Sequence, residues 1–137
     1  MRTRIALITI LTDNPAGMVR FYRDVLGFEP QGEVDEANPS YVEFKHEGVR
    51  FAICPRSVMA QFVGHASFSE TLRGQSFELA FPCASPAEVD SDYEALIARG
   101  AEPVMAPANM PWNQRTACFA DPDGNIHEIF ADLPETG

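Results

Sequence analysis

The chain presents one order of sequence features twice, and this duplication restricts its possible folds more than any other property. Each half begins with an apolar run, continues with a capped helix that ends at a glycine, and closes with strand-like segments around a glycine turn. The paired landmarks are Asn14 and Ser85, Gly27 and Gly100, and Gly48 and Gly124, separated by 71, 73 and 76 residues. The pattern predicts two βαβββ modules.

The first module is predicted to span residues 4–54 and the second residues 76–131. In the first, we expect a strand at 5–11, a helix from Asn14 to Gly27, and a hairpin of strands at 41–46 and 49–54. In the second, we expect a strand at 76–83, a helix from the Ser85 capping box to Gly100, and strands at 102–105, 115–120 and 125–130. Residues 55–75 are too long for a tight connection and are predicted to form a loop with some helix.

A module of this size buries little surface alone, so the two modules are expected to form one domain over residues 1–137. The expected fold class is α+β. The modules would share a curved, eight-stranded mixed sheet with helices on the outside. The concave face of such a sheet can hold a small ligand.

Charge and composition exclude several classes of protein. The 20 acidic and 10 basic residues give a net charge of −10, which argues against a nucleic-acid partner. No apolar run is long enough for a membrane span, and the short N-terminal run, interrupted by Thr9 and Thr12, is interpreted as a strand and not a signal peptide. Three widely spaced cysteines are typical of reduced thiols in the cytoplasm, the expected location.

Three segments carry a resemblance to a known family: "FYRDVLGF" at 21–28, "ARGAEPV" at 98–104 and "FADPDGNIHEIF" at 119–130. With the duplicated frame, they resemble the vicinal oxygen chelate superfamily, which contains glyoxalase I, bleomycin-resistance proteins and extradiol dioxygenases. The resemblance covers about residues 4–131 and is closer to the compact bleomycin-resistance-type members. It implies a homodimer with pockets formed partly at the subunit contact.

The resemblance also implies four equivalent strand positions that hold a divalent metal ion in the metal-using members. Aligned on this chain, they are Ala6, Ala52, Glu78 and Glu128. Two alanines and no histidine are a poor set of ligands, since such ions normally take three or four protein donors. We therefore expect no cofactor, with a metal at Glu78 and Glu128 only as the alternative, and the two-histidine site of an extradiol dioxygenase is absent.

Glu78 and Glu128 occupy equivalent positions and are expected to lie near each other. They could act as a general acid and base, because paired carboxylates raise one pKa. They could instead hold a cationic or amine-bearing ligand. The third possibility is a structural ion pair with Arg50, which alternation places on the face of Ala52.

Five further residues are weighed as site candidates. Trp112 follows a proline-rich stretch and is either a stacking lid over a ligand or a loop residue folded onto its own domain. Arg115 could contact a ligand carboxylate, form a salt bridge or decorate the surface. His127 should face away from Glu128, because neighbours in a strand point to opposite sides. His65 in the connection could complete a site, whereas His46 at the hairpin turn is expected to be solvated.

Two functions from different classes follow. The first is a metal-free protein that sequesters a small or cationic molecule, like bleomycin-resistance proteins. The second is a glyoxalase-like lyase or isomerase that uses Glu78 and Glu128 with a metal ion or as an acid/base pair.

Overall fold

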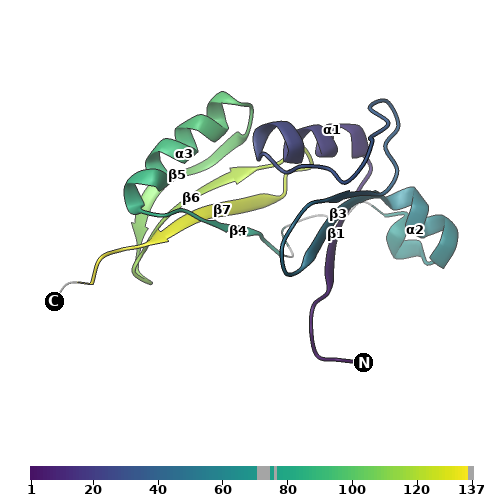
Figure 1. Cartoon of the computed structure of the whole chain (residues 1–137), viewed down its shortest axis with the longest axis horizontal. Helices are drawn as coiled ribbons and strands as arrows, with labels where there is room; N and C mark the ends of the chain where they lie inside the picture. The colour runs from purple at the N-terminus through teal and green to yellow at the C-terminus, as the bar shows by residue number, and fades with distance from the viewer. Residues whose placement is uncertain (71–74, 76, 136–137) are drawn as a thin grey trace. The chain divides into compact units, whose positions relative to one another are not determined.

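The computed structural model describes residues 1–70, 75 and 77–135, and the chain forms two compact units, Met1–Arg73 and Gly74–Gly137 (Figure 1). Each unit has its own sheet. The strand orders are β1-β3-β2 in the first unit and β4-β7-β6-β5 in the second. The α+β class is confirmed. The prediction of one eight-stranded sheet is not: the described residues form seven strands in two sheets. Among them, no helix combines the length and apolarity needed to cross a membrane.

In the sheet of the first unit, β1 (Leu7–Thr12) pairs in parallel with β3 (Arg50–Pro55), and β2 (Val42–Phe44) pairs with β3 in the antiparallel sense. Beyond β2 lies a single bridge between Pro30 and Phe44, and the described residues contain no fourth strand of the predicted βαβββ pattern in this unit. The glycine, proline and acidic residues that follow Pro30 do not favour a strand. The ladder therefore stops after one bridge.

One helical segment covers the core of the first unit. Helix α1 (Pro15–Arg20) begins after Asn14, whose Oδ1 accepts from the Gly17 N–H at 3.1 Å, and continues as the π-helix η1 (Phe21–Val25). The π-helical continuation was not predicted from sequence. The buried side chains of the two helices are Met18, Val19, Phe21, Tyr22 and Val25. Tyr22 packs among Phe28, Phe44 and Phe51, with ring centroids 5.4–6.5 Å from its own.

The connection after β3 contains the helix that the sequence predicted. Helix α2 (Arg56–Val63) ends at Gly64 in the left-handed conformation and is followed by the 3₁₀-helix η2 (Ala66–Phe68). Residues 71–74 and 76 lie outside the described part of the chain, and the predicted start of the next strand at Ser76 falls there.

The second unit consists of β4 (Ala80–Pro82), α3 (Pro86–Ala98), β5 (Glu102–Met110), β6 (Gln114–Ala120) and β7 (Ile126–Asp132). Strand β4 pairs with β7 in parallel, and the remaining pairs are antiparallel. Helix α3 packs on one face of this sheet (Figure 1). That face buries Ala117, Phe119, Ile129 and Ala131. The opposite face, which we call the distal face, carries the candidate site.

Strand β5 is longer than the predicted 102–105 and lies at the edge of the sheet. Its register against β6 shifts twice, between Pro103 and Met105 and between Met105 and Ala108. An edge strand with bulges accepts prolines, because one side of its backbone needs no partner.

Candidate functional site

The distal face of the second sheet brings together three of the titratable side chains. Glu128 on β7 lies opposite Cys118 on β6 and opposite Ala80 on β4. Glu78 precedes Ala80 by two residues and therefore projects to the same side if the extended chain continues. Leu79, between them, accepts a hydrogen bond at its carbonyl from the Glu128 N–H at 2.9 Å.

The charges of these neighbouring side chains act on one another. Glu128 is half-buried, and burial together with the charge of Glu78 raises the pKa of its carboxyl group. The pKa of the Cys118 thiol is likewise raised by burial and by the charges of Glu128 and Glu78. Two carboxyl groups and a thiol thus share one patch, in which Glu128 and Cys118 each hold their proton more tightly than they would in isolation.

A hydroxyl group lies on the same face. Thr116, two residues before Cys118 on β6, is 1% exposed. Among the described residues, its Oγ1 is the buried side-chain atom that has no hydrogen-bond partner. Buried polar atoms normally have a partner, so this hydroxyl group is an exception, and it lies beneath the surface of the distal face.

Arg50 does not form the ion pair with Glu78 or Glu128 that was considered from the sequence. It forms a bidentate ion pair with Glu43, with Nη2–Oε1 and Nε–Oε2 distances of 2.7 and 3.0 Å. The Tyr41 hydroxyl also donates to Glu43 at 2.6 Å. The Arg50 and Tyr41 hydrogen bonds lower the pKa of Glu43 to about 2. Within the described residues, neither Glu78 nor Glu128 forms an ion pair.

The first sheet has its own side facing away from the buried aromatic cluster. Ala52 pairs with Thr9 and with Glu43 on this side. The register places Leu7 two residues before Thr9 on the same side, and Ala6, the position aligned from the sequence, precedes Leu7 by one residue. Glu43 was missed because its pairing with Ala52 depends on long-range register. The signal was present, however, as the acidic residue in the alternating segment "YVEF".

The donor set does not fit the metal site of the metal-using relatives. Over residues 1–70, 75 and 77–135, no three His, Cys, Asp or Glu side chains are grouped so that they could hold a metal ion. Divalent transition-metal ions take three or four protein donors, usually with imidazole among them. His46 contacts the Val49 carbonyl at 2.6 Å, and His65 accepts from the Ser67 N–H at 3.2 Å, both at exposed positions.

His127 lies on the α3 side of the sheet, as alternation predicted. It is fully buried, and its ring contacts those of Phe81 and Phe119 at centroid distances of 6.3 and 6.1 Å. Its Nδ1 accepts from the Leu79 N–H at 3.1 Å, and its Nε2 lies 3.5 Å from Asp121 Oδ2. This histidine contributes to the support of the site and not to its surface.

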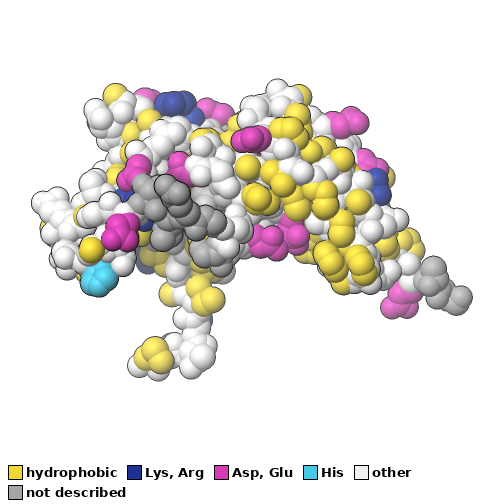
Figure 2. All heavy atoms as spheres, turned by 180° about the vertical axis from the view of Figure 1, so that it is seen from behind, with side chains coloured by type: hydrophobic (Ala, Val, Ile, Leu, Met, Phe, Trp, Pro, Cys, Tyr) yellow, Lys and Arg dark blue, Asp and Glu magenta, His cyan; other side chains and the backbone are white. Residues whose placement is uncertain are grey.

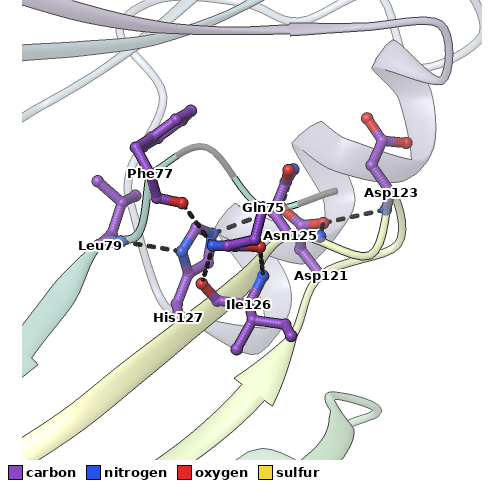
Figure 3. A network of polar contacts seen from close by, with 8 residues as sticks. All are labelled: Gln75, Phe77, Leu79, Asp121, Asp123, Asn125, Ile126 and His127. Carbon is purple, nitrogen blue, oxygen red and sulfur yellow. Dashed lines mark hydrogen bonds and ion pairs between the residues drawn. The ribbon is translucent and has the colours of Figure 1, made fainter. Parts of the chain in front are cut away.

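A polar network fixes the turn before β7 (Figure 3). The buried Asp121 accepts from the backbone N–H groups of Asp123 and Asn125 at 3.0 Å each, and from Asn125 Nδ2 at 2.8 Å. Gln75 binds Ile126 with its side-chain amide: Nε2 donates to the Ile126 carbonyl at 2.8 Å, and Oε1 accepts from the Ile126 N–H at 3.0 Å. The sequence "DPDGN" predicted the turn, but not the role of Gln75.

Arg115 and Trp112 lie away from the carboxyl pair. Arg115 is on the α3 side, where its Nε contacts Asp90 Oδ1 at 2.7 Å, so of its predicted roles the structure shows the salt bridge. Trp112 is 61% exposed in the turn between β5 and β6. The four-residue rise along β6 from Cys118 to Gln114 is about 14 Å, so within this unit Trp112 does not reach Glu128.

The surface around these elements mixes apolar and acidic side chains (Figure 2). The second unit exposes the large hydrophobic residues Phe77, Val104 and Trp112. Acidic side chains lie between the apolar areas on the visible face.

Comparison with known proteins gives matches along both units. Residues 4–129 match the family model of the Glyoxalase/Bleomycin resistance protein/Dioxygenase superfamily. The uncharacterized protein YraH of Bacillus subtilis (strain 168) is 30% identical over 132 residues, which cover 95% of this chain and 99% of that protein. The crystal structure of a glyoxalase/bleomycin resistance protein/dioxygenase from Nocardioides is 31% identical with a TM-score of 0.84, covering 100% of this chain and 87% of that one. A family enzyme from Burkholderia phytofirmans PsJN is 25% identical with a TM-score of 0.80, covering 96% and 100%.

Proposed function

Because the chain belongs to the glyoxalase/bleomycin resistance protein/dioxygenase superfamily, we propose that it is a small-molecule-binding protein whose distal face holds an amine-bearing or cationic ligand. Glu78 and Glu128 bind the positive group. Binding requires no divalent metal ion. The protein would sequester its ligand, as the bleomycin-resistance branch of the superfamily does.

The observation that carries this proposal is the carboxyl pair without a cation. Burial and Glu78 both disfavour the charged form of Glu128, and the described residues supply no positive side chain to either carboxylate. A bound ammonium group would reverse this situation, because an opposite charge at hydrogen-bond distance favours the carboxylate. The site is therefore more complementary to a cation than to a neutral or anionic ligand.

The test compares benzylamine with benzyl alcohol, a neutral molecule of nearly the same shape. Binding is measured by calorimetry and by the side-chain ¹³C shifts of the glutamates, with EDTA present. We expect benzylamine to bind and to move the Glu78 and Glu128 signals, whereas benzyl alcohol leaves them in place. Glu128→Gln should weaken binding about tenfold or more, because a hydrogen bond to a charged group contributes about 1.5–3 kcal/mol.

Glu94→Gln is the matched control, since it removes the same charge from an exposed position on α3. It should leave the affinity nearly unchanged. Equal affinity for the two probes would refute the proposal. So would one tightly held nickel, zinc, manganese or iron ion per chain after incubation with these metals.

A second function has support from the same pair. A carboxyl group of raised pKa beside another carboxylate is suited to exchange a proton with a substrate. This arrangement suits a lyase or isomerase of the glyoxalase type that works by acid/base chemistry. Turnover of a methylglyoxal–thiol adduct that is lost in Glu128→Gln, with no binding of benzylamine, would favour the enzyme.

We also propose that the two units arose by duplication and that the protein acts as a cytoplasmic homodimer. In both sheets the first strand of the unit pairs in parallel with its last strand, which supports the duplication. The family resemblance supports the dimer, and sedimentation analysis of the purified chain tests it.

A further inference from the structure

We propose that His127 is a positioning residue that holds the Leu79 backbone and thereby keeps Glu78 beside Glu128. Neither the family match nor the ligand proposal requires this role. The inference rests on the proposed function only in assigning Glu78 and Glu128 to the ligand, and its geometry stands without a ligand.

Leu79 is tied to β7 through both of its backbone polar groups. Figure 3 shows the first of these contacts, with His127. Its N–H donates to His127 Nδ1 at 3.1 Å, and its carbonyl accepts from the Glu128 N–H at 2.9 Å. The His127 side chain lies on one side of the sheet and the Glu128 side chain on the other. The two contacts together fix the peptide that follows Glu78, one residue before β4 begins.

The orientation of the His127 ring is determined by its surroundings. Because Nδ1 accepts a hydrogen bond, the neutral ring carries its proton on Nε2, which points toward Asp121 Oδ2 at 3.5 Å. Asp121 is held in turn by the Asn125 side chain and the turn backbone. The imidazole is fully buried between the Phe81 and Phe119 rings, so it has little freedom to release Leu79.

A second contact acts upstream of Glu78. The Gln75 side-chain amide pairs with both backbone polar groups of Ile126, and it also donates to the Phe77 carbonyl. The segment that carries Glu78 is therefore attached to β7 on both sides of this residue. Strand β4 begins only at Ala80, so before that residue these side-chain contacts, and not strand pairing, attach the segment to β7.

The position of Glu78 affects the chemistry of the site directly. The titratable groups near Glu128 on the distal face are Glu78 and Cys118, and the charge of Glu78 contributes to the raised pKa of Glu128. If Leu79 were released, Glu78 would move away from Glu128, and the pKa of Glu128 would fall toward its ordinary value. This pKa consequently reports on the position of Glu78.

The first experiment uses the unmodified protein without ligand. Nitrogen-15 NMR should show His127 protonated at Nε2, and a scalar coupling across the hydrogen bond should connect Leu79 N with His127 Nδ1. Protonation at Nδ1, or a missing coupling to an otherwise sharp Leu79 amide signal, would overturn the proposal. This measurement does not depend on whether any variant folds.

The second experiment separates positioning from packing with two variants. His127→Asn places a carbonyl oxygen near the position of Nδ1 and keeps the acceptor, but it loses the ring contacts. His127→Phe keeps an aromatic ring and loses the acceptor. We expect His127→Phe to lower the pKa of Glu128, followed by ¹³C titration of its carboxyl carbon, and His127→Asn to leave it nearly unchanged while lowering the melting temperature.

Glu78→Gln provides the control, because it removes the charge through which His127 is proposed to act. In this background His127→Phe should no longer change the pKa of Glu128, as a double-mutant cycle requires for a coupled pair. A shift that persists in Glu78→Gln, or equal shifts in the Asn and Phe variants, would overturn the proposal. If benzylamine does not bind, the ligand proposal fails, whereas these titrations of the free protein still decide the role of His127.

Discussion

At the scale of single residues, Glu128 should make the stability of the protein depend on pH. Burial and Glu78 raise its pKa in the folded state above the value in the unfolded chain. Below the pKa of the unfolded chain, about 4.3, the Glu128 carboxyl group is neutral in both states and does not lower the free energy of unfolding. Between the unfolded pKa and the raised folded pKa, the folded state holds a proton that the unfolded state has lost, so stability falls as the pH rises through this window and levels off above it.

Glu128→Gln should therefore melt at a higher temperature than the unmodified protein at pH 7, and the difference should disappear below about pH 4. Thermal unfolding of both proteins between about pH 4 and pH 7 measures this difference in melting temperature. Glu94→Gln corrects for the change in net charge. A difference between Glu128→Gln and this control that is independent of pH would show that ionisation of Glu128 is not its source.

Part of the candidate site could be predicted from single residues and their neighbours. Alternation correctly placed His127 opposite Glu128, because it depends only on the chain being a strand there. The partner of Arg50 could not be predicted in this way. Glu43 lies on another strand, and its contact with Arg50 depends on the register of β2 against β3, which long-range packing decides. The register of β1 against β3 likewise places Leu7 on the side of Ala52, where the alignment from sequence had placed Ala6.

At the scale of elements, the start of α3 depends on a local cap. Ser85 Oγ accepts from the Glu88 N–H at 3.2 Å, and Glu88 accepts from the Ala84 N–H with its side chain. Ser85→Ala should lower the free energy of unfolding by about 1 kcal/mol, because it leaves an N–H group at the helix start without its side-chain acceptor. Ser85→Asp, which keeps an acceptor, should retain most of the stability.

Urea unfolding of the two Ser85 variants measures this difference. An unchanged midpoint for Ser85→Ala would mean that water satisfies the helix start equally well. Because α3 packs on the side of the sheet opposite Glu128, benzylamine binding at a temperature where both variants are folded should not change. A loss of binding that follows the loss of stability would contradict this separation between the helix and the distal face.

The elements that the sequence predicted correctly are those with local causes. Both helix starts follow from a side-chain acceptor and a proline within a few residues, and the turn before β7 follows from Asp121 and the glycine after it. The errors have non-local causes. Strand β5 extends to Met110 because β6 pairs with it despite two prolines, and the bridge at Pro30 stays single because nothing downstream continues the ladder.

At the scale of the whole molecule, the excess of acidic residues should assist the capture of a cation. The net charge of −10 gives the surface a negative potential that attracts positive ligands from a distance. Salt shortens this range: the Debye length falls from about 30 Å at 0.01 M to about 8 Å at 0.15 M. The affinity for benzylamine should therefore fall several-fold over this interval, measured by calorimetry at fixed pH.

The size of this decrease separates the general field from the carboxyl pair. Glu94→Gln removes one charge from the field and leaves the pair intact, so its affinity at 0.15 M should equal that of the unmodified protein. Glu128→Gln should lose affinity at both salt concentrations, because the half-buried contact is screened much less than the surface charges are. If salt abolished the difference between the unmodified protein and Glu128→Gln, the ligand would be held by the diffuse charge of the surface and not by a site on the distal face.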